Sequence, residues 1–230
     1  MESRSLGPKN LNVIQAAALG GILGPVLFGS VLIVLTLLEE DFMRRLGWSP
    51  FGLSNTDWPS GLALGQYGYI MSAAFLLNGV MVVLFGLGLW KALPPIVMAR
   101  AATLLMMLAG VAMMGLTFAT DASIRHLPPT IHGRIHDACF AALGSTLFPS
   151  MLIFGRVFRQ SPAWRGLSTY PWVTAVLAIP TFAFKGASFY LFLGAVLTWT
   201  LIVSLKLRTA SRQWNIPSLA SPPCASKTPD

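Results

Sequence analysis

The stretch VIQAAALGGILGPVLFGSVLIVLTLL, residues 13–38, decides the fold class. It contains no Asp, Glu, Lys or Arg, and a helix of about 20 apolar residues is long enough to cross a bilayer. It is longer than the roughly 7–15 apolar residues of a cleavable signal peptide, so we expect it to remain as a first membrane span. Five further apolar stretches are interpreted in the same way, at residues 64–90, 96–119, 135–154, 168–184 and 187–205.

Composition supports this interpretation. Of the 230 residues, 54% are apolar and 10% are charged, and the mean hydropathy is +0.66. An average soluble domain has about 25% charged residues, so this chain has too few polar groups to cover a water-exposed surface. A soluble globular domain, a disordered protein and a nucleic-acid-binding protein are therefore excluded. The sequence predicts an all-α, polytopic membrane protein: a bundle of six transmembrane helices whose partner is the lipid bilayer.

The net charge of +8 is explained by topology rather than by nucleic-acid binding. Positively charged loops face the cytoplasm, and the six predicted spans divide the 16 basic residues into eleven on one side and five on the other. This predicts cytoplasmic N and C termini in a plasma or inner membrane. The predicted organisation is a cytoplasmic N-terminal segment (1–12), a transmembrane domain (13–205) and a disordered, Ser- and Pro-rich cytoplasmic tail (206–230). The eleven inner residues are Arg4, Lys9, Lys91, Arg100, Arg156, Arg159, Arg165, Lys206, Arg208, Arg212 and Lys227.

The first outer loop, residues 40–63, contains Trp48, Phe51 and Trp58 among Gly, Pro and Ser. Aromatic side chains next to membrane spans commonly lie at the level of the lipid headgroups. We therefore expect this loop to rest on the membrane surface.

The residues with the clearest chemical potential lie in the stretch TFATDASIRHLPPTIHGRIHDAC, residues 117–139. His132 and His136 are four residues apart, so on a helix they share one face and could both bind a metal such as zinc. Asp121 ends the preceding span and could meet them across the hairpin. The three residues are candidate catalytic residues and candidate ligands of a divalent metal. The alternative is a hydrogen-bonded cap that holds two helix ends together.

Asn78 is the most polar side chain deep within a predicted span. Such residues commonly form hydrogen bonds between helices. No ionisable residue lies near the middle of a predicted span, which argues against an ion-coupled transporter.

Two segments carry a family resemblance: SNTDWPSGLALGQYGYIMSAAFLLNGVMVVLFGLGL, and GLTFATDASIRHLPPTIHGRIHDACFAAL with its F-x-T-D and H-G-x-x-H-D motifs. The sequence resembles a family of six-span, mainly bacterial membrane proteins catalogued as domain of unknown function 998, over most of residues 12–205. The resemblance implies the fold and the membrane location, and it places Asp121, His132 and His136 in the family's polar motif. Members often have T-D-P where this chain has Thr120, Asp121 and Ala122.

Three hypotheses for function follow. The first is a multi-pass membrane protein with a structural or regulatory role, which binds a protein partner or a lipid and carries the Asp/His cluster at the outer end of its third and fourth spans. The second is a membrane-embedded, metal-dependent or acid/base enzyme, similar to a hydrolase, that acts on a lipid or a lipophilic small molecule. The third is a small transporter or permease. The sequence leaves open whether the protein is an enzyme, and also its oligomeric state.

Overall fold

The computed structural model describes residues 8–49, 51, 58–121, 129–178, 181 and 187–214, and within them every regular element is helical. The helical membrane bundle predicted from the sequence is thereby confirmed. The α-helices are α1 (Pro8–Leu38), α2 (Glu40–Arg45), α3 (Gly68–Ala92), α4 (Val97–Gly115), α5 (Ile131–Gln160), α6 (Thr169–Ala178) and α7 (Ala187–Trp214), and the 3-10 helices are η1 (Ser60–Leu64) and η2 (Arg165–Leu167).

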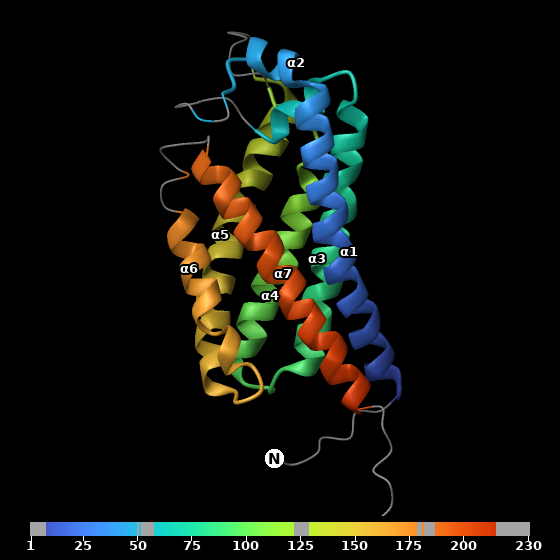
Figure 1. Cartoon of the computed structure of the whole chain (residues 1–230), viewed down its shortest axis with the longest axis vertical. Helices are drawn as coiled ribbons and strands as arrows, with labels where there is room; N and C mark the ends of the chain where they lie inside the picture. Colours follow the sequence, from blue (N-terminus) through green and yellow to red (C-terminus); the bar gives the residue numbers. More distant parts are fainter. Residues whose placement is uncertain are drawn as a thin grey trace, which may run out of the picture.

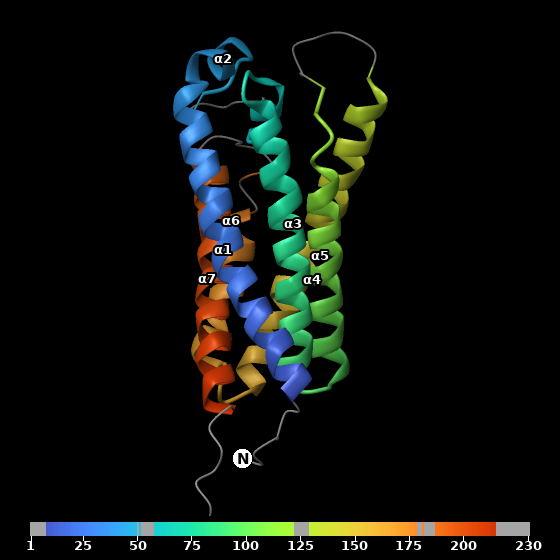
Figure 2. The same ribbon diagram turned by 90° about the vertical axis from the view of Figure 1, so that its right-hand side faces the viewer.

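The long helices form an elongated bundle in which neighbours in the chain are neighbours in space (Figures 1 and 2). In chain order, α1 packs against α3, α3 against α4, α4 against α5, α5 against α6 and α6 against α7, and α7 packs back against α1. The helices therefore form a closed ring. α1 begins and α7 ends at the same end of the bundle, opposite α2 (Figure 1).

Five helices are long and apolar enough to cross a membrane, namely Asn10–Leu38, Gly68–Ala92, Val97–Gly115, Ile131–Gln160 and Ser188–Arg212. Their outward faces carry large apolar side chains that are half or more exposed, such as Ile33, Leu37 and Val111. Such a surface is stable in lipid and would associate in water. The bilayer as the surrounding solvent thus explains the exposed apolar residues.

The sixth predicted span, residues 168–184, is not among these five. Its described helix, α6, has ten residues, about 15 Å of helix against a hydrocarbon core of about 30 Å. Residues 179–180 and 182–184 of this stretch lie outside the described part of the chain. Six full transmembrane helices are therefore not confirmed, although α6 runs along the bundle beside α5 and α7 (Figure 1).

The first and last long helices extend beyond residues 13 and 205, the predicted bounds of the transmembrane domain. α1 begins at Pro8, and α7 continues past residue 205 to Trp214. The first nine residues of the predicted disordered tail are therefore helical. Residues 215–230 lie outside the described part of the chain.

The segment between α1 and α3 folds over one end of the bundle, and we name residues 39–49 and 58–67 the cap. Trp48 and Trp58 are buried, at 4% and 5% exposed, in a cluster that joins the cap to α1, α3 and α7. The Trp58 ring lies 4.1 Å from the Tyr190 ring, between centroids, and its indole N–H donates to Thr36 Oγ1 at 3.2 Å. These tryptophans therefore pack into the protein core and not against lipid headgroups, and the expectation that the loop rests on the membrane surface stays a prediction. Phe51, in contrast, is 90% exposed.

Candidate functional site

Asp121 lies in the extended stretch after α4 and serves the start of α5. Its Oδ2 accepts the Thr130 backbone N–H and its Oδ1 accepts the Thr130 hydroxyl, both at 2.8 Å. The Thr130 oxygen in turn accepts the Gly133 N–H at 3.0 Å, as the N-cap of α5. Four N–H groups are unpaired at a helix start, and the helix dipole is positive there. A carboxylate beside the N-cap residue therefore stabilises the start of α5.

Gly133 shows how closely Asp121 approaches α5. A Cβ atom at this position would lie 2.1 Å from Asp121 Oδ2. The H-G-x-x-H-D motif therefore needs glycine here so that the carboxylate can reach the helix start.

His136 is 3% exposed and bridges three parts of the α2 end of the bundle. Its Nδ1 lies 2.7 Å from the Phe118 carbonyl oxygen and its Nε2 lies 2.9 Å from Ser60 Oγ. Because a carbonyl can only accept, Nδ1 donates to it, and in the neutral imidazole Nε2 then accepts the Ser60 hydroxyl. The imidazole thus fastens α5 both to the end of α4 and to η1 in the cap.

His132 lies one turn before His136 on α5 but in different surroundings. It is exposed, and its ring centroid is 5.7 Å from that of Phe118. Asp121 and His136 direct their hydrogen bonds to other groups, and the described residues contain no group of three or more His, Cys, Asp or Glu side chains that could hold a metal ion. The assignment of Asp121, His132 and His136 as catalytic or metal-binding residues stays a prediction. The third histidine, His126, lies outside the described residues.

Sequence reasoning missed Glu39, which is a buried carboxylate inside the cap. It is 5% exposed, and its Oε1 accepts the Tyr67 backbone N–H at 2.6 Å. No group in the described residues donates to its Oε2. Gly65 leaves room for this carboxylate, since a Cβ there would lie 1.5 Å from Oε2.

Asn78 is buried among three helices of the bundle. Its amide donates from α3 to Met113 Sδ of α4 at 3.2 Å, and its Oδ1 lies against Gly24 of α1 without a hydrogen-bond donor in the described residues. This geometry matches the interhelical contact expected from the sequence. It gives no support to a transport path past Asn78.

A helical bundle with apolar outer faces and five helices long and apolar enough to cross a membrane is a multi-pass membrane protein. Residues 22–208 match the family described as "Protein of unknown function (DUF998)", and the chain belongs to that family. The resemblance inferred from the two sequence segments is thus confirmed. No curated protein and no solved structure matches the chain.

Proposed function

We propose that this chain is a cell-membrane protein with both ends in the cytoplasm and a structural or regulatory role, whose cap faces outward to meet a lipid or a protein partner. In this proposal Asp121 and His136 hold the cap and the α4–α5 hairpin together and do not react. One observation carries it: both carboxylate oxygens of Asp121 and both ring nitrogens of His136 already have partners within the protein.

The charge distribution supports the proposed orientation. In the described part of the chain, the end opposite α2 has nine basic residues and no acid, whereas all five described acids lie at the α2 end. The positive-inside rule then puts the α2 end outside. The basic residues are Lys9, Lys91, Arg100, Arg156, Arg159, Arg165, Lys206, Arg208 and Arg212, and the acids are Glu39, Glu40, Asp41, Asp121 and Asp137.

A double-mutant cycle on Ser60 and His136 tests the proposal. Ser60→Ala, His136→Ala and the double variant would be unfolded thermally in detergent. A hydrogen bond that holds the cap should give a coupling free energy of about 1 kcal/mol. His132→Ala is the matched control on the same helix. Because His132 is exposed, this change should alter the free energy of unfolding by less than about 0.5 kcal/mol.

The cellular readout separates a structural role from a catalytic one. If the residues only hold the fold, Asp121→Asn and His136→Gln should reduce any cellular phenotype in proportion to the folded protein that remains. Complete loss of the phenotype at normal levels of folded protein would contradict the proposal.

A second candidate rests on the Ser60–His136 pair itself. A serine hydroxyl 2.9 Å from an imidazole whose other nitrogen is held by a carbonyl matches the nucleophile–base–orienter arrangement of acyl-transfer enzymes. This Ser60–His136 arrangement favours an acid/base hydrolase that acts on a lipophilic ester or amide over a metal-dependent hydrolase. A fluorophosphonate probe applied to membranes would label Ser60 in this case, and Ser60→Ala would abolish the label. Because Ser60 is 7% exposed, this candidate also requires that the cap opens to admit the probe, and absence of labelling on folded wild-type protein would contradict it.

A further inference from the structure

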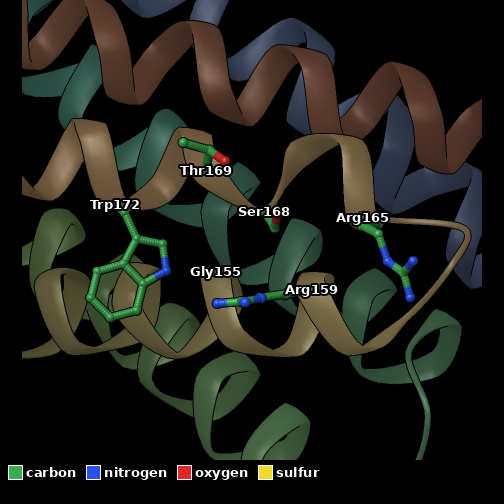
Figure 3. Close-up of a pocket in the computed structure, with 6 residues that line it drawn as sticks. All are labelled: Gly155, Arg159, Arg165, Ser168, Thr169 and Trp172. Atoms are coloured by element: carbon green, nitrogen blue, oxygen red, sulfur yellow. The ribbon is translucent and has the colours of Figure 1, made fainter.

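A pocket of about 570 Å³ opens at the end of the bundle opposite the cap, between the end of α5 and the start of α6 (Figure 3). This volume is typical of small-molecule sites. Figure 3 shows the Arg159 side chain running along α5 toward the Trp172 indole. The lining residues are Gly155, Arg159, Arg165, Ser168, Thr169 and Trp172.

The two arginines of this pocket have no acidic partner among the described residues. Within the described residues, neither the Arg159 nor the Arg165 guanidinium forms an ion pair or a hydrogen bond, and both side chains are exposed. The described acids all lie at the opposite end of the bundle. A guanidinium presents five N–H donors and no acceptor. The two free guanidinium groups are therefore available to an anion from outside the chain.

The other lining groups suit the same kind of ligand. Ser168 and Thr169 supply hydroxyl groups, and the Trp172 indole supplies an N–H donor. Gly155 brings this indole close to α5, because a Cβ at Gly155 would lie 2.1 Å from Trp172 Nε1. Among the described residues that line the pocket, none carries a carboxylate. Arginine forks combined with hydroxyl donors match the oxygens of a phosphate group.

The position of the pocket indicates which phosphate it meets. Arg159 is the last residue but one of the α5 span, and Trp172 is 39% exposed near the start of α6. The Arg156 guanidinium lies 5.9 Å from the centroid of the Trp172 ring. Partly exposed tryptophan and arginine at the end of a span are typical of the membrane–water interface. Basic pockets between helices on the cytoplasmic side of a membrane suit anionic headgroups.

We propose that this pocket binds the phosphate of an anionic lipid headgroup in the adjacent leaflet, through Arg159 and Arg165. The site is separate from the Asp121 and His136 cluster, and the proposed role of that cluster does not enter the argument. Free phosphate has the same chemistry, so the test has to separate the two sources.

The test compares lipid binding by the full-length protein in mixed micelles, measured by native mass spectrometry and by titration. The probes are dioleoyl phosphatidylglycerol, dioleoyl phosphatidylcholine and inorganic phosphate. Wild type should prefer phosphatidylglycerol to phosphatidylcholine by at least tenfold. Arg159→Gln with Arg165→Gln should weaken phosphatidylglycerol binding by about 30-fold, since each basic group near anionic lipid accounts for roughly a factor of five.

Arg208→Gln with Arg212→Gln is the matched control, because it removes two exposed positive charges from the same end of the bundle but outside the pocket. It should change binding by less than twofold. Equal loss in both double variants would overturn the proposal in favour of general surface charge, as would equal binding of the two lipids by wild type. Displacement of phosphatidylglycerol by millimolar inorganic phosphate would overturn the assignment to a lipid. Thermal unfolding of each variant checks that it is folded.

Discussion

Gly65→Ala is the substitution by which the cap is best tested. Gly65 has φ −80° and ψ −177°, an extended conformation that alanine adopts without strain. The added methyl group would nevertheless lie 1.5 Å from Glu39 Oε2 and 2.3 Å from its carboxyl carbon. Since carbon and oxygen in contact are about 3.5 Å apart, the buried carboxylate has to move by about 2 Å.

That movement breaks the 2.6 Å hydrogen bond between Glu39 and the Tyr67 N–H. A buried donor without an acceptor costs about 1–3 kcal/mol, and the crowding of a packed core costs a similar amount. We expect a loss of about 3 kcal/mol in the free energy of unfolding. For a chain of this length that corresponds to a fall in Tm of about 6–12 °C, measurable by thermal unfolding in detergent.

A second substitution isolates the cause. In a Glu39→Ala background the space of the carboxylate is vacant. Gly65→Ala should then lower the free energy of unfolding by less than about 1 kcal/mol. Gly194→Ala is the matched control, because a Cβ there meets no atom within 4 Å and alanine favours helix; Tm should stay equal or rise slightly. If Gly65→Ala costs the same with and without the Glu39 carboxylate, the reasoning is refuted.

Two further predictions concern the α5 start and the topology. Asp121→Asn and Thr130→Ala should each lower the free energy of unfolding by about 1 kcal/mol, and the double variant by less than the sum, because the residues share the same hydrogen bonds; additive losses in thermal unfolding would contradict this. Reporter fusions after Arg165 and after Lys206 should be cytoplasmic and one after Pro129 external, and a cytoplasmic signal at Pro129 would reverse the orientation.

Much of the fold could be predicted because the bilayer imposes a simple requirement. A span must be about 20 apolar residues long and must satisfy its backbone internally, so the runs that became α1, α3, α4, α5 and α7 are visible in composition alone. Residues 168–184 meet the composition requirement too, but composition does not report where a helix ends. Within this stretch, the described α-helix α6 has ten residues.

The burial of the cap tryptophans could not be predicted from the sequence for a related reason. Trp48 and Trp58 look like headgroup anchors when a loop is considered by its composition, because both a membrane interface and a protein core favour indole rings. The difference depends on Tyr190 and Phe189 of α7, which lie more than 130 residues further along the chain and cover the Trp58 ring. A local pattern does not contain that contact.

The candidate site also contains residues that the sequence indicates and residues that depend on contacts distant in the chain. Asp121 and His136 stand out because they are polar residues at the ends of apolar runs, yet Ser60, which bonds His136, is 76 residues away and is one of many serines. Glu39, however, left a signal that could have been used. It follows Phe28, Leu32 and Leu35 at steps of four, three and four, so it continues the buried face of α1. Of the three consecutive acids at the end of that helix, only the first lies on this face. If the helical periodicity of α1 is continued past Leu38, it places the Glu39 carboxylate inside the protein. There the carboxylate needs both the Tyr67 N–H and the space left by Gly65.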